Sequence, residues 1–150
     1  MKVVIQRVTR ASVTIEQQLF SSIDKGMLIL VGIQADDTDE DINWLSSKIV
    51  NLRIFDDENG VMNKSVLDTN GEILTVSQFT LMARTKKGTR PSYIDAAPPA
   101  ISVPLYEKFV TTLSQELHKE VQTGQFGANM KVELINDGPV TIIIDSKNRQ

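Results

Sequence analysis

The feature that most constrains the fold of this chain is a proline between two strand-like runs. Residues 131–135 and 140–145 both have β-strand patterns, and Gly138-Pro139 lies between them. Proline cannot donate a hydrogen bond to a sheet and it fixes φ, so the dipeptide must lie at a strand edge or a sharp bend, where a cis peptide is one solution. Taken locally, the simplest interpretation is a hairpin turn, because Asp137, Gly138 and Pro139 are common turn residues.

Composition places the chain among ordinary globular proteins. Of its 150 residues, 41% are hydrophobic and 23% are charged, which predicts a single domain over residues 1–150. The absence of cysteine excludes disulfides, thiol nucleophiles and cysteine metal ligands. The longest apolar run, residues 27–33, is too short for a membrane span, and an early charge argues against a signal peptide. We therefore expect a soluble, cytoplasmic protein with no membrane partner.

Strand patterns dominate the first third of the chain. Residues 2–8, 11–15 and 19–23 are rich in strand-forming residues, and residues 27–33 are apolar on both faces, which is typical of a central strand covered from both sides. Asn59-Gly60 predicts a hairpin between residues 53–55 and 61–62. Residues 72–81 are expected to form one strand ending in Ser77-Gln78-Phe79-Thr80-Leu81.

Two segments have helical periodicity. Thr38 can cap a helix with an acidic first turn and an apolar stripe of Ile42, Leu45, Ile49 and Leu52. Pro104 is expected to begin a second helix, and residues 147–150 are expected to fray. About seven strands and two helices predict an α/β fold in which the helices pack on one side of a curled, barrel-like mixed sheet.

Residues 83–99 lack periodicity, and such a long irregular segment within a compact domain is usually functional or disordered. Within seven residues around Gly88 the segment holds four cations, namely Arg84, Lys86, Lys87 and Arg90. This density suits a phosphate backbone. The net charge of −3 argues against a protein wrapped broadly around nucleic acid, but it permits such a local patch. A merely solvated basic loop is the alternative.

The sequence offers few conventional catalytic groups. Ser77 and Thr80 could be nucleophiles, but the only histidine, His118, lies off the apolar stripe of its helix and suits neither as a base. One histidine and solvated acids make no ligand cluster, so neither a metal nor another cofactor is expected. The remaining hydroxyls and the Gln78 amide suit hydrogen bonding to a polar substrate, although simple alternation across a sheet is the other interpretation.

A series of short motifs occurs in order along nearly the whole chain: Arg7-Val8 with Ala11-Ser12-Val13, Leu52-Arg53-Ile54-Phe55, Gly60-Val61-Met62-Asn63, Ser77-Gln78-Phe79-Thr80-Leu81, Lys87-Gly88-Thr89-Arg90-Pro91, Ala96-Ala97-Pro98, Gly124-Gln125-Phe126-Gly127-Ala128-Asn129-Met130 and Asn136-Asp137-Gly138-Pro139-Val140-Thr141. Each motif alone would be weak. Together, in this order, they resemble the D-aminoacyl-tRNA deacylases, dimeric enzymes that remove D-amino acids mistakenly esterified to tRNA. Two departures are Glu16-Gln17-Gln18, where the family usually has glycine, and Tyr93, where phenylalanine is common.

The resemblance implies a pocket for the terminal adenosine and the ester. Its catalytic part would comprise Ser77, Gln78, Phe79 and Thr80, with backbone N–H groups near Phe79 and Thr80 as oxyanion donors. Its adenine side would comprise Phe126, Gly127, Ala128 and Met130. The 2′-hydroxyl of the substrate would assist the reaction, and the basic residues from Arg84 to Arg90 would face the tRNA backbone.

The resemblance also implies that Gly138-Pro139 is a cis peptide that enters the pocket of the partner subunit in a homodimer. There its carbonyls would receive the substrate's α-ammonium, and its shape would exclude the side chain of an L-amino acid. Arg7 would help to hold the dipeptide.

The expected function is therefore hydrolysis of D-aminoacyl-tRNA to free D-amino acid and tRNA. An aminoacyl ester is already activated, so oxyanion stabilisation of about 4 kcal/mol would accelerate hydrolysis roughly a thousandfold without a triad. The rigid main chain of Gly138-Pro139 would exclude the side chain of an L-amino acid, but glycine has no side chain to exclude. Some cleavage of glycyl-tRNA is therefore also expected. Thr80 is preferred as a substrate-orienting group, since a nucleophile would need an unseen base. The alternative function is a non-catalytic module for single-stranded DNA, because some relatives are associated with unwound DNA.

Overall fold

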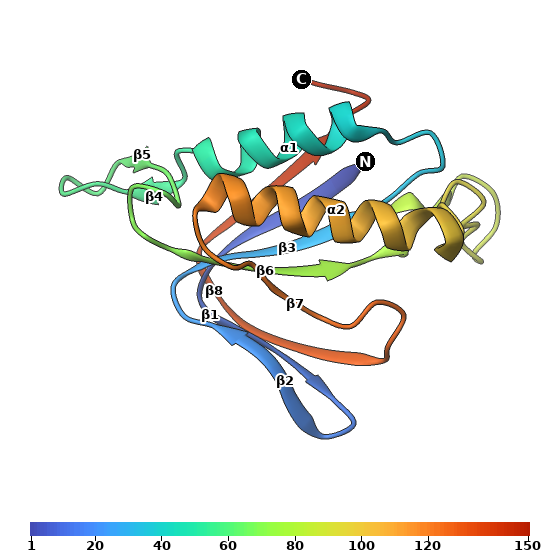
Figure 1. Cartoon of the computed structure of the whole chain (residues 1–150), viewed down its shortest axis with the longest axis horizontal. Helices are drawn as coiled ribbons and strands as arrows, with labels where there is room; N and C mark the ends of the chain where they lie inside the picture. Colours follow the sequence, from blue (N-terminus) through green and yellow to red (C-terminus); the bar gives the residue numbers. More distant parts are fainter.

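The computed structural model describes residues 1–150. Helices α1 (Asp39–Asn51) and α2 (Pro99–Leu117) lie together on one face of a curled sheet (Figure 1). The sheet contains β1 (Lys2–Ile15), β2 (Gln18–Ile23), β3 (Gly26–Gly32), β6 (Glu72–Ser77), β7 (Gln122–Thr123) and β8 (Met130–Asp145), and β4 (Phe55–Asp56) pairs separately with β5 (Met62–Lys64). This arrangement confirms the predicted fold class. Neither helix is long and apolar enough to cross a membrane.

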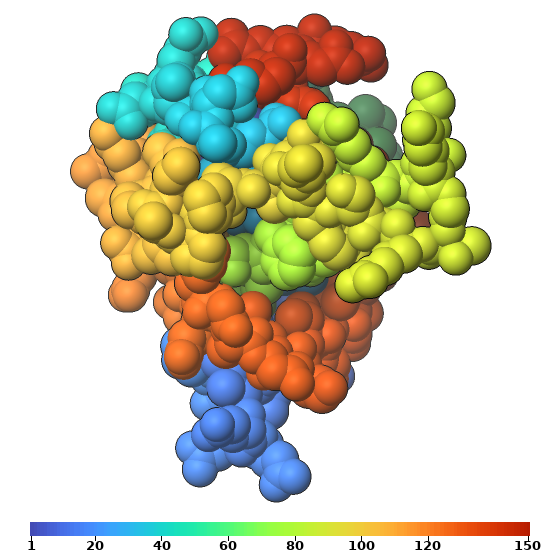
Figure 2. Space-filling model, turned by 90° about the vertical axis from the view of Figure 1, so that its right-hand side faces the viewer, coloured from blue at the N-terminus to red at the C-terminus, as the bar shows by residue number.

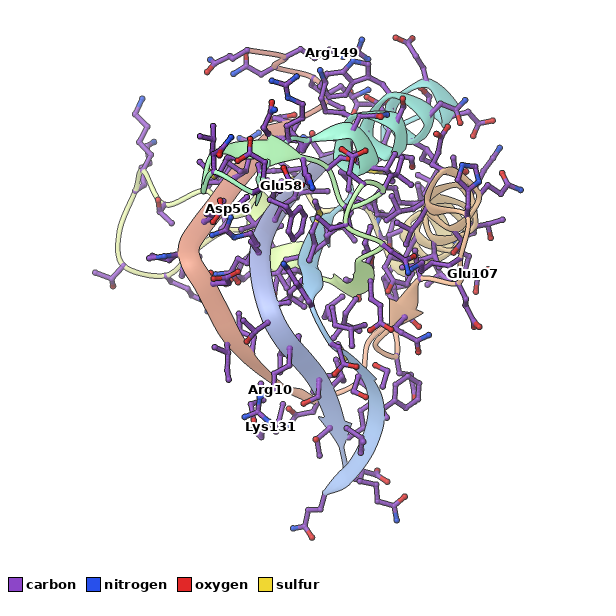
Figure 3. All side chains as sticks on the ribbon, turned by 90° about the vertical axis from the view of Figure 1, so that its left-hand side faces the viewer. Arg10, Asp56, Glu58, Glu107, Lys131 and Arg149 are labelled. Carbon is purple, nitrogen blue, oxygen red and sulfur yellow. The ribbon has the colours of Figure 1, made fainter.

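The long strand β1 organises the sheet. Its first half pairs with β3, its second half pairs with β2, and β8 pairs with it along nearly its whole length, all antiparallel. The parallel pairs β3–β6 and β6–β7 make the sheet mixed. β1 is the only pairing partner of β8, so β8 is an edge strand, and Figure 3 shows it running along the outside of β1.

Strand β3 separates two apolar clusters. Met27, Ile29 and Val31 face the larger cluster, which lies between the sheet and the two helices. Leu28 belongs to a smaller cluster on the opposite face, and the half-buried Leu30 packs against that cluster. The sequence prediction of a central strand covered on both sides is confirmed, and the fold gains two places where apolar surface is removed from water.

The start of α1 is as predicted, and two residues of the predicted frayed tail, Lys147 and Arg149, contact this helix. Thr38 caps the helix, and its N–H donates to the Asp41 carboxylate at 2.8 Å. Lys147 Nζ also donates to Asp41 at 2.9 Å, and the Arg149 guanidinium lies 4.4 Å from the centre of the Trp44 ring. These two cations thus have an acidic and an aromatic partner on α1, which the sequence prediction did not include.

The hairpin interpretation of Gly138-Pro139 was also wrong. Residues 131–135 and 140–145 are consecutive parts of β8, and both pair with β1. Gln6 pairs with Thr141 and Val8 with Asn136, so the four residues 137–140 lie opposite Arg7 alone. This is a large bulge rather than a turn. It is tolerated because β8 is an edge strand, where proline removes no necessary ladder hydrogen bond.

Three further boundaries differ from the predictions. Helix α2 begins at Pro99, with Pro98 as N-cap, and Pro104 lies inside its second turn; Pro99 suits the first helical position because that N–H needs no partner. The strand predicted over residues 72–81 ends at Ser77, and Phe79–Met82 form a short 3-10 helix, η1. The short strand β7 was not predicted.

Candidate active site

A pocket of about 470 Å³ lies where the carboxyl ends of the parallel strands β3 and β6 meet the segment after β7. Crevices outside the carboxyl ends of parallel strands are frequent ligand sites. In Figure 2 the end of β6 lies in a hollow between the start of α2 above and residues 124–130 below. Val31, Ile33 and Val76 form apolar parts of its lining.

The pocket brings together most of the predicted site. It is lined by Ser77, Gln78 and Phe79 from the end of β6, and by Phe126, Gly127, Ala128 and Met130 from the opposite wall. Thr80 does not line the pocket. It adjoins the lining residues on η1, where its hydroxyl accepts a hydrogen bond from the Gln78 side-chain amide.

The chain direction changes sharply at Gln78. Its backbone N–H donates to the Val31 carbonyl at 2.7 Å, and its carbonyl accepts from the Leu81 N–H at 3.2 Å as η1 begins. Phe79 is therefore not a strand residue, and 58% of its surface is exposed. The turn gives the Phe79 ring an exposed position in the lining of the pocket.

The opposite wall is fixed by β6 and α2. The Gly124 N–H donates to the Thr75 carbonyl at 3.1 Å, and the Tyr106 hydroxyl donates to the same carbonyl at 3.0 Å. The Tyr106 ring also packs 5.8 Å from the Phe126 ring. Burial raises the pKa of Tyr106 well above its ordinary value, so its hydroxyl remains a donor and continues to support this wall.

No charged side chain lines the pocket, and no histidine lines it either. The polar groups that this chain gives the pocket are hydroxyl, amide and backbone groups, which can position a substrate and stabilise developing negative charge. Sequence reasoning missed Pro99 and Ser102, which reach the pocket from the start of α2. Their role depends on where α2 begins, and the prediction of a later start at Pro104 concealed it.

Gly138-Pro139 does not line this pocket. The peptide bond is cis, both residues are exposed, and Gly138 has a φ of +125°. The neighbouring Arg7 is 6% exposed. It donates to the Asp137 carbonyl at 3.0 Å and the Ile54 carbonyl at 2.7 Å, and it lies 3.2 Å from the Asp56 carboxylate. Figure 3 shows Asp56 on the same side of the molecule as β1 and β8.

The basic segment forms a loop that projects from the body of the molecule (Figure 2). Two backbone hydrogen bonds between Arg84 and Ser92, of 2.8 and 3.0 Å, close the loop, and Arg84 is paired with Asp95. Lys86, Lys87 and Arg90 are exposed and make no ion pair. No aspartate or glutamate occurs from residue 73 to residue 94. The loop therefore presents three free positive charges in a chain of negative net charge.

Comparison with known proteins agrees with this architecture. A family model described as D-Tyr-tRNA(Tyr) deacylase matches residues 4–145. Proteins named D-aminoacyl-tRNA deacylase from Flavobacterium psychrophilum and Bacteroides thetaiotaomicron are each 69% identical to this chain, over all of both sequences.

Solved structures give the same result for the fold. A c-Myc DNA unwinding element binding protein superposes with a TM-score of 0.90 at 43% identity, covering 97% of this chain and 98% of its own. A probable eukaryotic D-amino acid tRNA deacylase has a TM-score of 0.83 at 15% identity, with 95% and 97% covered, and this likeness shows the fold alone.

The fold and the relatives together define a hydrolase. The chain belongs to the D-aminoacyl-tRNA deacylase family, as its motifs predicted.

Proposed function

We propose that this chain hydrolyses the ester bond of D-aminoacyl-tRNA in the pocket between β6 and residues 124–130, releasing D-amino acid and tRNA. The observation that carries the proposal is the division of the site: the pocket gathers seven of the expected residues but no charged group. Gly138-Pro139, the element expected to recognise the α-ammonium, is exposed outside that pocket. A second copy of the chain would supply Gly138-Pro139, and with it the acceptors for the α-ammonium, to the pocket of the first copy.

Within the pocket, the terminal adenosine lies against Phe126, Gly127, Ala128 and Met130, and the ester lies near Ser77 and Gln78. Thr80 orients the substrate, since no base is within its hydrogen-bonding reach; its recorded partner is the Gln78 amide. Backbone N–H groups near Phe79 and Thr80 stabilise the oxyanion, an interaction worth about 3–4 kcal/mol per donor in other hydrolases. The 2′-hydroxyl of the ribose assists the attack of water.

The edge strand β8 supports a homodimer. Its outer side lacks a strand partner, and Ile143 on it is 68% exposed. An unpaired edge with exposed apolar residues is a surface that proteins usually cover. In the dimer, Gly138-Pro139 enters the partner subunit's pocket, where its carbonyls accept hydrogen bonds from the α-ammonium. Its main chain then excludes the side chain of an L-amino acid, whereas glycyl esters, which have no side chain, are accepted and hydrolysed.

The substrate's tRNA body follows the basic loop. Lys86, Lys87 and Arg90 are free to bind phosphates, whereas Arg84 is partly neutralised by Asp95. The whole chain acts as one domain, in the cytoplasm, where aminoacylated tRNA is found.

Hydrolysis of D-tyrosyl-tRNA and L-tyrosyl-tRNA in the presence of a chelator tests the proposal. We expect rapid release of D-tyrosine, slow release of L-tyrosine and no effect of the chelator. Equal rates for the two esters would contradict chiral selection, and no release from either would contradict the function. A dilution series of the protein tests the dimer, because dissociated subunits should lose both the rate and the preference for the D-ester.

A second candidate function is binding of single-stranded DNA. It is favoured by the 43% identical structure named for binding a DNA unwinding element, and by the free cations of the loop. Salt-dependent binding of single-stranded DNA that is tighter than tRNA binding, without ester cleavage, would support this candidate instead.

A further inference from the structure

An aromatic pair lies at the mouth of the pocket. Phe79 and Tyr93 are 58% and 39% exposed, and their ring centroids are 5.1 Å apart with an angle of 74° between the rings. Ile94, the next residue, is 78% exposed. Large apolar side chains gathered on one exposed site frequently mark a place where a ligand binds.

The pair is held in place by its backbone. Ser92, before Tyr93, is bonded to Arg84 in both directions, and the Ala96 N–H donates to the Tyr93 carbonyl at 3.0 Å. The Ala97 N–H then donates to the Ile33 carbonyl at 2.9 Å, which ties the segment to the end of β3. The backbone position of Tyr93 is therefore fixed by the fold, so binding a ligand there would require little further ordering of the backbone.

The surroundings favour a nucleotide over an apolar protein surface. The loop that ends at Tyr93 carries the unpaired cations Lys86, Lys87 and Arg90, and the nearby Asp95 is neutralised by Arg84. Flat rings beside free cations are the combination that binds a base together with its phosphate. The rings meet edge to face, so at least one ring face on each remains free of the other for stacking.

We propose that Phe79 and Tyr93 form a stacking site for the base of the nucleotide that precedes the terminal adenosine. The inference rests on the proposed function, because Phe79 also lines the pocket that would hold the adenosine. The chain leaving that pocket meets Tyr93 next, with the basic loop within reach of its phosphate. Stacking does not depend on base identity, so this site serves any tRNA.

The test compares two minimal substrates: the D-tyrosyl ester of adenosine, and the D-tyrosyl ester of the dinucleotide cytidylyl-adenosine. In the unaltered protein, kcat/KM should be higher for the dinucleotide. Tyr93→Leu should lower the ratio of the two kcat/KM values by about tenfold, because base stacking on an aromatic residue is lost. Tyr93→Phe is the matched control and should keep the ratio.

A dinucleotide without the cytosine base makes the test specific. It should be a poorer substrate for the unaltered protein, and Tyr93→Leu should have no further effect on its ratio to the adenosine ester. An unchanged ratio in Tyr93→Leu with the complete dinucleotide would overturn the stacking site. Failure of the unaltered protein to cleave either ester would instead contradict the proposed function.

Discussion

The pocket at the ends of β3 and β6 and the Gly138-Pro139 bulge of β8 are built in opposite ways. The pocket is lined by apolar and neutral polar groups, and no ion pair supports its lining. The bulge is exposed, but a buried arginine with two backbone acceptors and two carboxylate partners, Asp56 and Asp137, lies directly behind it. The pocket provides a cavity, and the bulge provides main-chain groups that are held in position by Arg7.

The difference indicates where precision is needed. A pocket that accepts an adenosine can rely on shape and on hydrogen bonds that form with the ligand. In the proposed function, a backbone wall that separates D-aminoacyl from L-aminoacyl esters has to be placed before the substrate arrives, because rejection depends on a rigid obstacle. The charged support lies behind the bulge, away from the pocket proposed for the adenosine.

The largest expected effect is that of Arg7→Ala. It leaves the Ile54 and Asp137 carbonyls without their donor, and we expect a loss of about 3 kcal/mol in the free energy of unfolding. D-ester hydrolysis should fall further than the folded fraction does. Urea unfolding and single-turnover hydrolysis measure the two effects. Arg10→Ala, on the same strand, is the control, because Arg10 makes only an exposed pair with Glu133 and should change little.

Gly138→Ala should act on the reaction more than on stability. A Cβ at this position would lie 2.9 Å from a Val140 methyl and 3.1 Å from Arg7 Nη2, so the bulge must shift. A displacement of about 1 Å can cost roughly a hundredfold in rate. Gly60→Ala is matched, since Gly60 also has a positive φ of +74° but nothing within 4 Å. If Gly60→Ala lost the same activity, the effect would not be specific to the bulge.

Thr80→Ala tests the pocket side of the comparison. Loss of one orienting hydrogen bond should slow single-turnover hydrolysis about tenfold, with tRNA binding intact. Thr80→Ser should retain most of the rate. Complete loss of hydrolysis in Thr80→Ala, with binding unchanged, would instead identify Thr80 as a nucleophile.

A third region, at the start of α1, belongs to neither the pocket nor the bulge, so a change there should affect stability without affecting the site. Burial alone would raise the pKa of Asp41, but hydrogen bonds from Ser146, Lys147 and Thr38 outweigh it and lower the pKa. The folded state therefore gains stability from ionised Asp41 at pH values above its unfolded pKa of about 3.9, and loses it as the pH falls below that value. Asp41→Asn should make the free energy of unfolding depend less steeply on pH in the acid range, as measured by urea unfolding at a series of pH values. An unchanged pH dependence in the variant would show that other carboxylates cause the loss of stability in acid.

The smallest effect concerns the basic loop. Lys86→Gln and Lys87→Gln remove charges without ion-pair partners, and each should weaken tRNA binding and lower the slope of log K against log salt by about 0.7–0.9. Ester selectivity should not change, because neither residue lines the pocket or contacts the bulge. Lys108→Gln is a suitable control, since Lys108 is paired with Asp39 between the two helices. A change in the D to L ratio in either loop variant would show that the regions are coupled.

Local patterns predicted the elements that follow local rules. The helix capped by Thr38 and the central strand β3 were both found as expected. Each has a signal in consecutive residues, namely a capping residue before an acidic turn and a continuous apolar run. The Gly138-Pro139 hairpin failed because its alternative depends on β1, which is more than a hundred residues away and supplies the ladder that continues past the proline.

The candidate site was only partly visible for the same reason. Motif order gave Ser77 to Thr80 and Phe126 to Met130, and the structure brings these segments to opposite sides of one pocket or next to it. The packing of Tyr93 against Phe79 could not be predicted, because no periodicity links a loop residue to a 3-10 turn.

The bulge on β8 has a consequence for how this chain can vary over evolutionary time. The recognition element proposed at the bulge consists of main-chain atoms, so most exchanges of its own side chains would leave its groups in place, and Gly138, where a Cβ has no room, is the exception. Its other vulnerable points lie in the residues behind it, above all Arg7 and the carbonyls that Arg7 binds. Heritable loss of the proposed chiral selection should therefore also arise from substitutions that never touch the substrate, such as those of Arg7.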